Sequence, residues 1–302
     1  MHIKCDVVYM GGYTPLAMAV AGLICYLRRV PFGWINESHL LKPRSRFTRA
    51  VKEVLLRRII QPARASLAVS SPAKHYLVHY GADRDSVYLF PNTCDVEHLD
   101  MAVKRAQVRR PEISKRFGLS GNPAVLFIGR LAPEKNLDVL LKAWQHVQEA
   151  LPRAELLIVG EGPDAERLRR SARVMGLTSV RWAGWLQPDE IPDALAVSDC
   201  FVLPSRDEPF GVVVTEAMAA GLPVVVSDHV GAAEDLVANG RTGFVFPVDD
   251  ELALKDILIT LLGAPDLLAS IGAEARRAVS HWNYDMAVAN FISSVRRVWR
   301  TP

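Results

Sequence analysis

The sequence has little cysteine, with four residues among 302. The four are far apart, no two form a Cys-x-x-Cys pair, and none lies in a cluster with histidine. This spacing argues against a disulfide framework and against a cysteine-based zinc site, and it favours free, partly buried thiols in a reducing compartment. The cysteines are Cys5, Cys25, Cys94 and Cys200.

The sequence also lacks a long hydrophobic segment. Its longest apolar run, Pro15 to Leu27, has 13 residues and is too short to cross a bilayer. The run follows Tyr13 and Thr14, without the basic residues that introduce a signal peptide. We therefore expect a soluble, cytoplasmic chain.

Net charge is low as well, at +3, but the basic residues are unevenly distributed. Residues 42–64 contain eight lysines and arginines against one acid, Glu53. Leucines and isoleucines at 55–60 give the same segment a modest apolar stripe. It is either a solvated helix that packs on a core or a surface that contacts an anionic membrane or a phosphorylated acceptor, peripherally at the inner face. We expect no nucleic-acid partner.

Short apolar runs alternate with helix-period segments along the whole chain, which indicates parallel sheets flanked by helices. The fold class predicted is α/β, with two doubly wound domains. A polar stretch at 100–122 is interpreted as the connection between them. In the first part, strands are expected at 6–10, 32–36, 65–70 and 87–90, and helices at 14–29, 44–60 and 71–80.

The second part repeats this alternation, and its ligand crevice is expected at the carboxyl ends of the strands. A final helix at about 284–300 is expected to pack back across the domains. The predicted domains are 1–105, 106–282 and the helical tail 283–302. Strands are expected at 124–128, 155–159, 179–183, 200–203, 223–227 and 243–246, and helices at 137–150, 164–175, 189–197, 211–220 and 232–238.

Two cations follow the first strand of the second part. Gly129 allows a turn tight against a ligand, while Arg130 and Lys135 place positive charge at the strand end. Two fixed cations suit a diphosphate, whose leaving oxygen gains charge as a glycosidic bond breaks. The alternative is a pair of ordinary surface cations in a strand-to-helix loop.

A glycine-containing loop follows the next strand. Gly160 and Gly162 would bring backbone close to a ligand, and Pro163 is well placed to start a helix. Such loops are common, so this one gains weight only together with the others.

A third loop begins at Ser205 and carries two glutamates. Pro209 disfavours helical geometry at Glu208, so this carboxylate is expected on the loop. Gly211 begins a helix whose first N–H groups would bind a pyrophosphate. Glu216 lies about 7.5 Å further along the axis. A glutamate among valines and alanines is costly to bury without a partner, which favours a ligand contact over a satisfied core residue.

Together these loops resemble the donor motifs of the family-4 retaining glycosyltransferases, which have the GT-B fold of two Rossmann-like domains. Residues 208–216 match the family's E-x7-E motif, with its Pro-Phe-Gly centre and its Glu-Ala-Met-Ala-Ala-Gly-Leu-Pro-Val-Val continuation. Residues 129–136 and 160–163 match the other two motifs, in the family's order and at its spacing. The likeness covers the chain from about residue 5 to its end.

The resemblance implies an enzyme that moves a sugar from a nucleotide-diphosphate sugar to a glycolipid, polysaccharide or related glycoconjugate acceptor. Such enzymes retain the anomeric configuration and need no metal or other cofactor. The resemblance places Arg130 and Lys135 on the donor diphosphate and Glu216 on the ribose hydroxyls. It places Glu208 against the donor sugar and Leu186 at the base. The other donor-binding residues that it implies are Gly129, Glu161, Gly162, Phe210, Gly211 and Val212.

The first part departs from the family pattern. Members usually begin with a strand, a Gly-rich loop and further strand–helix units before the strand that residues 6–10 resemble. We therefore expect an incomplete N-terminal domain, from a fragment, a mis-started reading frame or a naturally shortened protein. Many members carry a histidine facing the transferred sugar after the second strand seen here. Glu37 takes that place and His39 follows, so both are candidate catalytic residues, with a structural role as the alternative for His39.

Other functions are weighed against this one. A donor-binding but catalytically incomplete chain that needs a partner subunit is the main alternative. An epimerase is disfavoured by the E-x7-E context, and a phosphorylase by the lack of a candidate cofactor lysine. An NAD-dependent enzyme is disfavoured because no G-x-G-x-x-G follows a strand.

Overall fold

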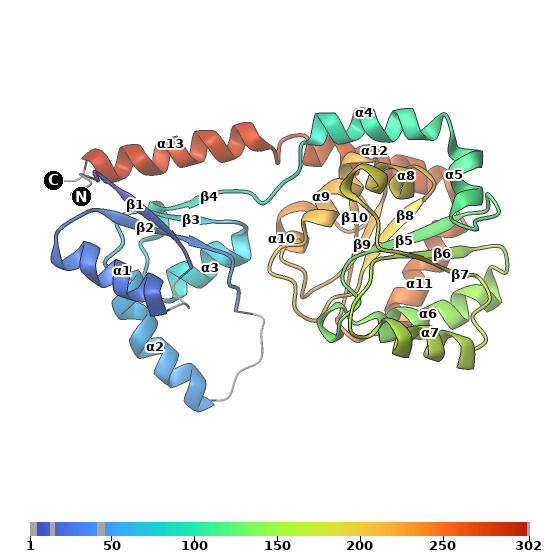
Figure 1. Cartoon of the computed structure of the whole chain (residues 1–302), viewed down its shortest axis with the longest axis horizontal. Helices are drawn as coiled ribbons and strands as arrows, with labels where there is room; N and C mark the ends of the chain where they lie inside the picture. The colour runs from blue at the N-terminus through green and yellow to red at the C-terminus, as the bar shows by residue number, and fades with distance from the viewer. Residues whose placement is uncertain (1–4, 13–15, 41–45, 301–302) are drawn as a thin grey trace. The chain divides into compact units, whose positions relative to one another are not determined.

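A computed structural model describes residues 5–12, 16–40 and 46–300 of the chain (Figure 1). Two compact units make up the chain, and each contains a parallel sheet with helices between successive strands, so the predicted α/β class is confirmed. The units divide between Asn92 and Thr93, whereas the sequence places this division after residue 105. The first unit is Met1–Asn92 with Asn283–Pro302, and the second is Thr93–Trp282.

The first unit has a four-stranded sheet in the order β1-β2-β3-β4. Trp34, Leu67 and Tyr76 are buried in its core. The final helix, α13, packs on β3 and β4, and its Phe291 meets Tyr9 of β1 with ring centroids 5.5 Å apart. The elements are β1 (Val8–Gly11), α1 (Leu16–Leu27), β2 (Phe32–Asn36), α2 (Arg46–Ile60), β3 (Ser66–Ala68), α3 (Ser71–His79), β4 (Val87–Leu89) and α13 (Tyr284–Arg300).

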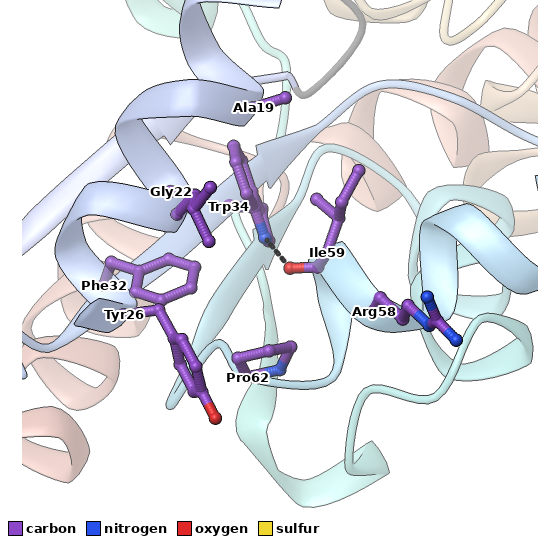
Figure 2. A pocket seen from close by; sticks show the side chains of 9 residues that line it. Ala19, Gly22, Tyr26, Phe32, Trp34, Arg58, Ile59 and Pro62 are labelled. Carbon is purple, nitrogen blue, oxygen red and sulfur yellow. Dashed lines mark hydrogen bonds between the residues drawn. The ribbon is translucent and has the colours of Figure 1, made fainter.

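Helices α1 and α2 leave an apolar hollow between them, above the strand β2 (Figure 2). The strands of this unit begin and end within a few residues of their predicted positions. The predicted helix starts at residues 14–15 and 44–45 lie outside the described residues. Across the described part of the chain, no helix is both long enough and apolar enough to span a bilayer.

The second unit has a six-stranded parallel sheet in the order β10-β9-β8-β5-β6-β7. The chain winds outward from β5 in one direction and from β8 in the other. In such a sheet the ligand crevice lies at the carboxyl ends of the strands where the order reverses, which here are β5 and β8. The strands are β5 (Ala124–Ile128), β6 (Glu155–Val159), β7 (Val180–Gly184), β8 (Cys200–Leu203), β9 (Val224–Ser227) and β10 (Gly243–Phe246).

Helices flank this sheet, and most match the prediction. The four cysteines of the chain are free, with Cys25 and Cys200 buried and Cys5 exposed. Short 3-10 turns lie at Arg84–Ser86, Pro133–Lys135 and Pro188–Glu190. The helices are α4 (Val96–Gln107), α5 (Arg110–Arg116), α6 (Leu137–Ala150), α7 (Ala165–Val174), α8 (Ile191–Ala196), α9 (Val212–Ala219), α10 (Ala232–Leu236), α11 (Glu251–Leu262) and α12 (Pro265–Val279).

The interpretation of residues 100–122 as an interdomain connection is wrong. Much of this stretch forms α4 and α5, and α4 packs against α8 and α9 within the second unit. Asp95 caps α4, because its carboxylate accepts a hydrogen bond from the N–H of His98 at 3.0 Å. Only Val103 and Ala106 of α4 are buried, so the helix has a weak apolar signal. The helices α11 and α12 are likewise absent from the prediction.

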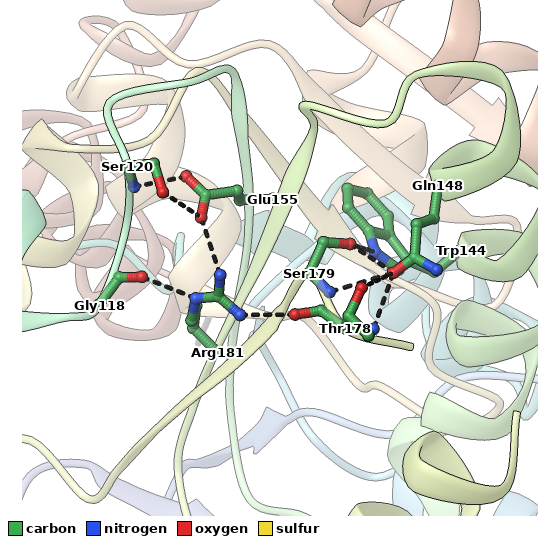
Figure 3. Close-up of polar contacts among 8 residues, drawn as sticks. All are labelled: Gly118, Ser120, Trp144, Gln148, Glu155, Thr178, Ser179 and Arg181. Carbon is green, nitrogen blue, oxygen red and sulfur yellow. Dashed lines mark hydrogen bonds and ion pairs between the residues drawn. The ribbon is translucent and has the colours of Figure 1, made fainter. Parts of the chain in front are cut away.

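Two polar clusters hold the amino ends of β6 and β7, opposite the expected crevice (Figure 3). In one, Glu155 is nearly buried and pairs with Arg181 at 3.3 Å. In the other, Gln148 of α6 accepts hydrogen bonds from the backbone N–H and the hydroxyl of Ser179, at 3.0 and 2.9 Å. The indole of Trp144 donates to the same hydroxyl at 3.0 Å. These contacts fix the frame that carries the loops at the other end of the strands.

Candidate functional site

The three loops predicted from the sequence lie together at the carboxyl end of the second sheet. The N–H of Leu131 in the first loop donates to the carbonyl of Glu161 in the second at 3.0 Å. The N–H of Arg206 in the third loop donates to the carbonyl of Glu134 in the first at 2.8 Å. They meet because β8, β5 and β6 are neighbours in the sheet. The fold thus joins motifs that are well separated in the sequence.

Glycines make the contact between the first two loops possible. A Cβ at Gly160, where φ is +127°, would lie 2.0 Å from the carbonyl oxygen of Gly129. A Cβ at Gly162 would lie 2.3 Å from the carbonyl oxygen of Leu131. Both distances are far below contact, so these glycines are required for the two loops to pack, whatever they do toward a ligand.

Lys135 and Glu208, two of the predicted site residues, form an ion pair. Their side chains are only 18% and 13% exposed. Glu208 lies on the loop, as predicted, where its backbone carbonyl accepts from the N–H of Gly231 at 2.9 Å. Partial burial strengthens such a pair, and removing one partner would leave the other charge uncompensated. The structure therefore brings the predicted diphosphate cation and the predicted sugar-facing carboxylate into direct contact.

The second predicted cation, Arg130, is exposed, and among the described residues it makes no hydrogen bond or ion pair. It is free to bind an anion at the end of β5. No group of three or more histidine, cysteine, aspartate or glutamate side chains in the described ranges is arranged to hold a metal ion.

Asp249, which the sequence analysis does not single out, connects the first and third loops. One of its carboxylate oxygens accepts from the amide of Asn136 at 2.9 Å and from the guanidinium of Arg206 at 2.8 Å. Both Asn136 and Asp249 have left-handed backbone, with φ of 55° and 67°. This bridge depends on residues more than a hundred positions apart, and no local sequence pattern signals it.

The helix α9 begins as predicted. Gly211 is its N-cap, with φ of +93°, so the first N–H groups of the helix, from Val212 onward, follow a left-handed turn. Glu216 lies on α9, and no hydrogen-bond or ion-pair partner for it exists among the described residues. Burial raises the pKa of its carboxyl above the ordinary value. A half-buried carboxylate without a partner destabilises the ligand-free protein.

Phe210, just before Gly211, is 2% exposed and stacks on Trp282. The ring centroids are 5.8 Å apart and the rings are inclined by 7°. The backbone carbonyl of Trp282 accepts a hydrogen bond from the hydroxyl of Thr93 at 2.5 Å. Trp282 is thus a support of the donor loop that the sequence analysis does not identify.

The predicted base-binding turn lies next to the second loop. The N–H of Gly160 donates to the carbonyl of Gly184 at 2.7 Å, and a Cβ at Gly184 would lie 3.4 Å from the carboxylate of Glu161. That carboxylate pairs with Arg169 at 2.6 Å, and this hydrogen bond raises the pKa of the Arg169 guanidinium. Leu186, the residue predicted to meet the base through its backbone, is buried.

Glu37 and His39 follow β2 in the first unit, whereas the residues above belong to the second. Glu37 is exposed and His39 is buried. The amide of Asn36, the last residue of β2, donates to the carbonyls of Ser38 and Ala73 at 3.0 and 3.1 Å, which fixes the turn. Neither unit by itself brings Glu37 or His39 together with Glu208.

Comparisons with known proteins identify the family of the chain. Residues 109–278 match the family described as glycosyl transferases group 1. A GDP-mannose-dependent alpha-(1-6)-phosphatidylinositol monomannoside mannosyltransferase of Mycobacterium tuberculosis is 33% identical over 196 residues, which are 62% of this chain and 51% of that protein. A sulfoquinovosyl transferase of Arabidopsis thaliana is 32% identical over 295 residues, which are 95% of this chain and 55% of that protein.

The fold is shared with solved glycosyltransferases. The structure of Anabaena HepE in complex with UDP and glucose matches with a TM-score of 0.74 and 23% identity, covering 96% of this chain and 78% of that one. This likeness supports the α/β fold of GT-B type. The chain spans about half the length of the curated relatives it matches.

Proposed function

The chain belongs to the group 1 glycosyl transferases, and we propose that it transfers a sugar from a nucleotide-diphosphate sugar to an acceptor with retention of anomeric configuration. One observation carries the proposal. Arg130 and Lys135 follow β5, Glu208 and the start of α9 follow β8, and Glu216 lies on α9. A nucleotide-diphosphate sugar needs this set, because it offers phosphates to cations and N–H groups and hydroxyls to carboxylates.

In this proposal the diphosphate binds Arg130, Lys135 and the N–H groups that follow Gly211. Charge grows on the diphosphate as the glycosidic bond breaks, so fixed cations stabilise the transition state more than the bound donor. They supply the neutralisation that a metal ion supplies in other enzymes. We therefore expect transfer without a resident metal or other cofactor.

The contact between Lys135 and Glu208 adds a further step to donor binding. An incoming diphosphate competes with Glu208 for Lys135, and the carboxylate becomes available to the positive charge that develops on the sugar ring. We assign Glu208 to electrostatic support of this oxocarbenium-like sugar. Glu216 would accept hydrogen bonds from the ribose, and the turn containing Leu186 would contact the base.

We assign acceptor binding to the first unit. We propose a glycan or lipid-linked acceptor, supported by the name of the mycobacterial relative, which acts on a phosphatidylinositol monomannoside. Glu37 and His39 remain candidates for contacts with the donor sugar or the acceptor. Residues 42–64 would contact an anionic membrane. In this segment Arg57 and Arg58 are exposed, and the side chains of residues 42–52 lie outside what the structure describes.

A thermal-shift panel with UDP, GDP and ADP tests donor binding. A nucleotide at a hundred times its dissociation constant stabilises the folded protein by about 2.7 kcal/mol, so a true donor base would stand out from the other two. No shift with any of the three would contradict the proposal.

A transfer assay with the sugar nucleotides of the selected base follows. Product formation supports an enzyme that is active alone, and the anomeric configuration of the product tests retention. Nucleotide binding without transfer would favour the alternative, a donor-binding chain that is catalytically incomplete. This alternative is supported by the observation that the chain matches only about half the length of its relatives.

A further inference from the structure

Helix α1 exposes a large apolar surface in the first unit. Leu23, Tyr26 and Leu27 are 56%, 60% and 70% exposed, and α2 also exposes Val54 and Leu55, both by more than half. Single exposed apolar side chains are ordinary on a protein surface, but a contiguous group marks a surface that binds something.

Between the two helices lies the hollow of Figure 2, with a volume of about 500 Å³. Trp34 forms part of its lining and is fully buried, and its indole N–H donates to the carbonyl of Ile59 at 3.1 Å. The polar atom of the indole is therefore already bonded, and the ring lies beneath the hollow with its own surface covered by neighbouring residues. A Cβ at Gly22 would lie 3.0 Å from the Trp34 ring, so the glycine allows α1 to approach it closely. The volume suits a small apolar ligand.

Positive charge lies beside this apolar surface. Arg58 lines the hollow, and Arg28 and Arg29 follow the end of α1. All three are exposed, and within the described ranges none has a hydrogen-bond or ion-pair partner. The acid of α2, Glu53, is already paired with Arg57 at 2.7 Å and lies 3.2 Å from His79. An apolar surface with unpaired arginines complements a surface that is both apolar and anionic.

We propose that the α1–α2 face docks on an anionic lipid bilayer, with one acyl chain entering the hollow and Arg28, Arg29 and Arg58 contacting lipid phosphates. Apolar side chains that insert and arginines that remain at the headgroups are the features of interfacial membrane helices. A symmetric dimer through this face would bring its arginines toward their own copies, which disfavours a second copy as the occupant. The inference deepens the proposed membrane contact and rests on it, but it is independent of donor binding in the second unit.

Vesicle flotation with the whole chain tests the docking. Phosphatidylcholine vesicles with an equal part of phosphatidylglycerol should carry the protein, and vesicles of phosphatidylcholine alone should carry much less. Leu23→Glu, with Leu27→Glu as a second variant, should reduce flotation about tenfold or more. Leu252→Glu is the matched control, because Leu252 is 55% exposed on α11 of the second unit, and it should have no effect. Arg58→Gln should weaken binding about fivefold, and the exposed Arg173→Gln should not.

Quenching by brominated acyl chains tests entry into the hollow. Vesicles of brominated phosphatidylglycerol should lower the fluorescence of the wild-type chain. Trp34→Phe should remove most of this decrease, whereas Trp185→Phe, at an exposed position of the second unit, should retain it.

Three results would overturn the inference. Flotation that is insensitive to Leu23→Glu and free of Trp34 quenching would mean electrostatic contact alone, which leaves the proposed contact of residues 42–64 standing. No flotation would remove both membrane proposals, while the nucleotide panel would still report on donor binding. Self-association abolished by Leu23→Glu would assign the face to a second copy.

Discussion

The phenyl ring of Phe210 lies parallel to the indole of Trp282, with centroids 5.8 Å apart and an angle of 7° between the rings. Phe210 immediately precedes Gly211, the N-cap of α9, and Trp282 is the last residue of the second unit. Thr93, the first residue of that unit, donates its hydroxyl hydrogen bond to the Trp282 carbonyl. The loop that would hold the diphosphate is therefore supported by the residues where the chain enters and leaves the unit.

Trp282→Ala should lower both stability and nucleotide affinity. The loss of a buried tryptophan costs about 3–5 kcal/mol, and the stack with Phe210 supports the backbone at Gly211. Urea unfolding and calorimetric titration of a nucleotide diphosphate measure the two effects. Trp282→Phe should restore most of the affinity. Trp144→Ala, at a fully buried tryptophan on α6, should lower stability only. Equal losses of affinity in both alanine variants would reduce Trp282 to a general core residue.

Glu216→Gln should have effects of opposite sign on stability and on binding. Burial raises the pKa of Glu216 above the ordinary 4.5, so the folded state holds this proton more tightly than the unfolded chain. The stabilisation from the protonated Glu216 carboxyl is fully present below the pKa of the unfolded chain. It is lost as pH rises through the higher pKa of the folded state. The glutamine variant should thus be more stable than wild type at pH 7, with the difference vanishing near about pH 4.

The same variant should bind nucleotide more weakly at pH 7. A hydrogen bond to a charged group is worth roughly 1.5–3 kcal/mol, and ribose would lose its charged acceptor. Urea denaturation at pH 7 and near pH 4 measures the change in stability, and a nucleotide titration measures the change in affinity. A glutamine variant that is less stable at pH 7, with unchanged affinity, would show a structural role and refute the ribose assignment.

Glu208→Gln should separate catalysis from binding. Loss of the carboxylate removes electrostatic support from the transition state, for which a decrease in transfer rate of about 10²–10³ is typical. Nucleotide affinity should stay the same or increase, because Lys135 no longer has Glu208 as a competing partner. Steady-state kinetics and direct titration provide the comparison. If rate and affinity declined in parallel, Glu208 would be a part of the donor pocket without a special role in the reaction.

Gly160→Ala should disrupt the site, whereas Gly176→Ala should not. Both glycines have positive φ, +127° and +70°, but only the Cβ at position 160 would collide with backbone, at Gly129. At position 176, where nothing lies near the added Cβ, alanine should lower the free energy of unfolding by about 1–2 kcal/mol from the backbone conformation alone. At position 160 the two loops must also separate, so stability should fall further and nucleotide binding should be lost. Comparable behaviour of the two variants would mean that the contact between the loops is unimportant for the site.

The sequence predicts the second sheet well because its strands are short, buried apolar runs. Val224–Ser227 and Cys200–Leu203 are buried at every position and coincide with, or lie within, the predicted ranges. The helix α4 is not predicted for the opposite reason, since only two of its residues are buried and its start depends on a cap at Asp95. The strand β3 is shorter than predicted because its parallel pairing ends at Ala68.

The candidate site, too, could be predicted from the sequence only in part. Strand order alone would bring Arg130, Lys135, Glu208 and Glu216 to one edge, so the loops can be identified from spacing and turn residues. The contacts of Lys135 with Glu208 and of Phe210 with Trp282 join residues 73 and 72 positions apart, and only the folded chain shows them. Glu37 and His39 follow a strand of the other unit, so the strand order of the second sheet does not place them.

Calorimetric titration of UDP and GDP into the wild-type chain, Arg130→Gln and Arg173→Gln tests the central claim most directly. Both arginines are exposed and without an ion-pair partner in the described part of the chain, but only Arg130 lies at the end of β5. We predict that one nucleotide binds at a single site, that Arg130→Gln weakens this binding by about tenfold or more, and that Arg173→Gln leaves it unchanged. Binding that is equally strong in all three proteins, or absent from wild type, would contradict a diphosphate site at this edge.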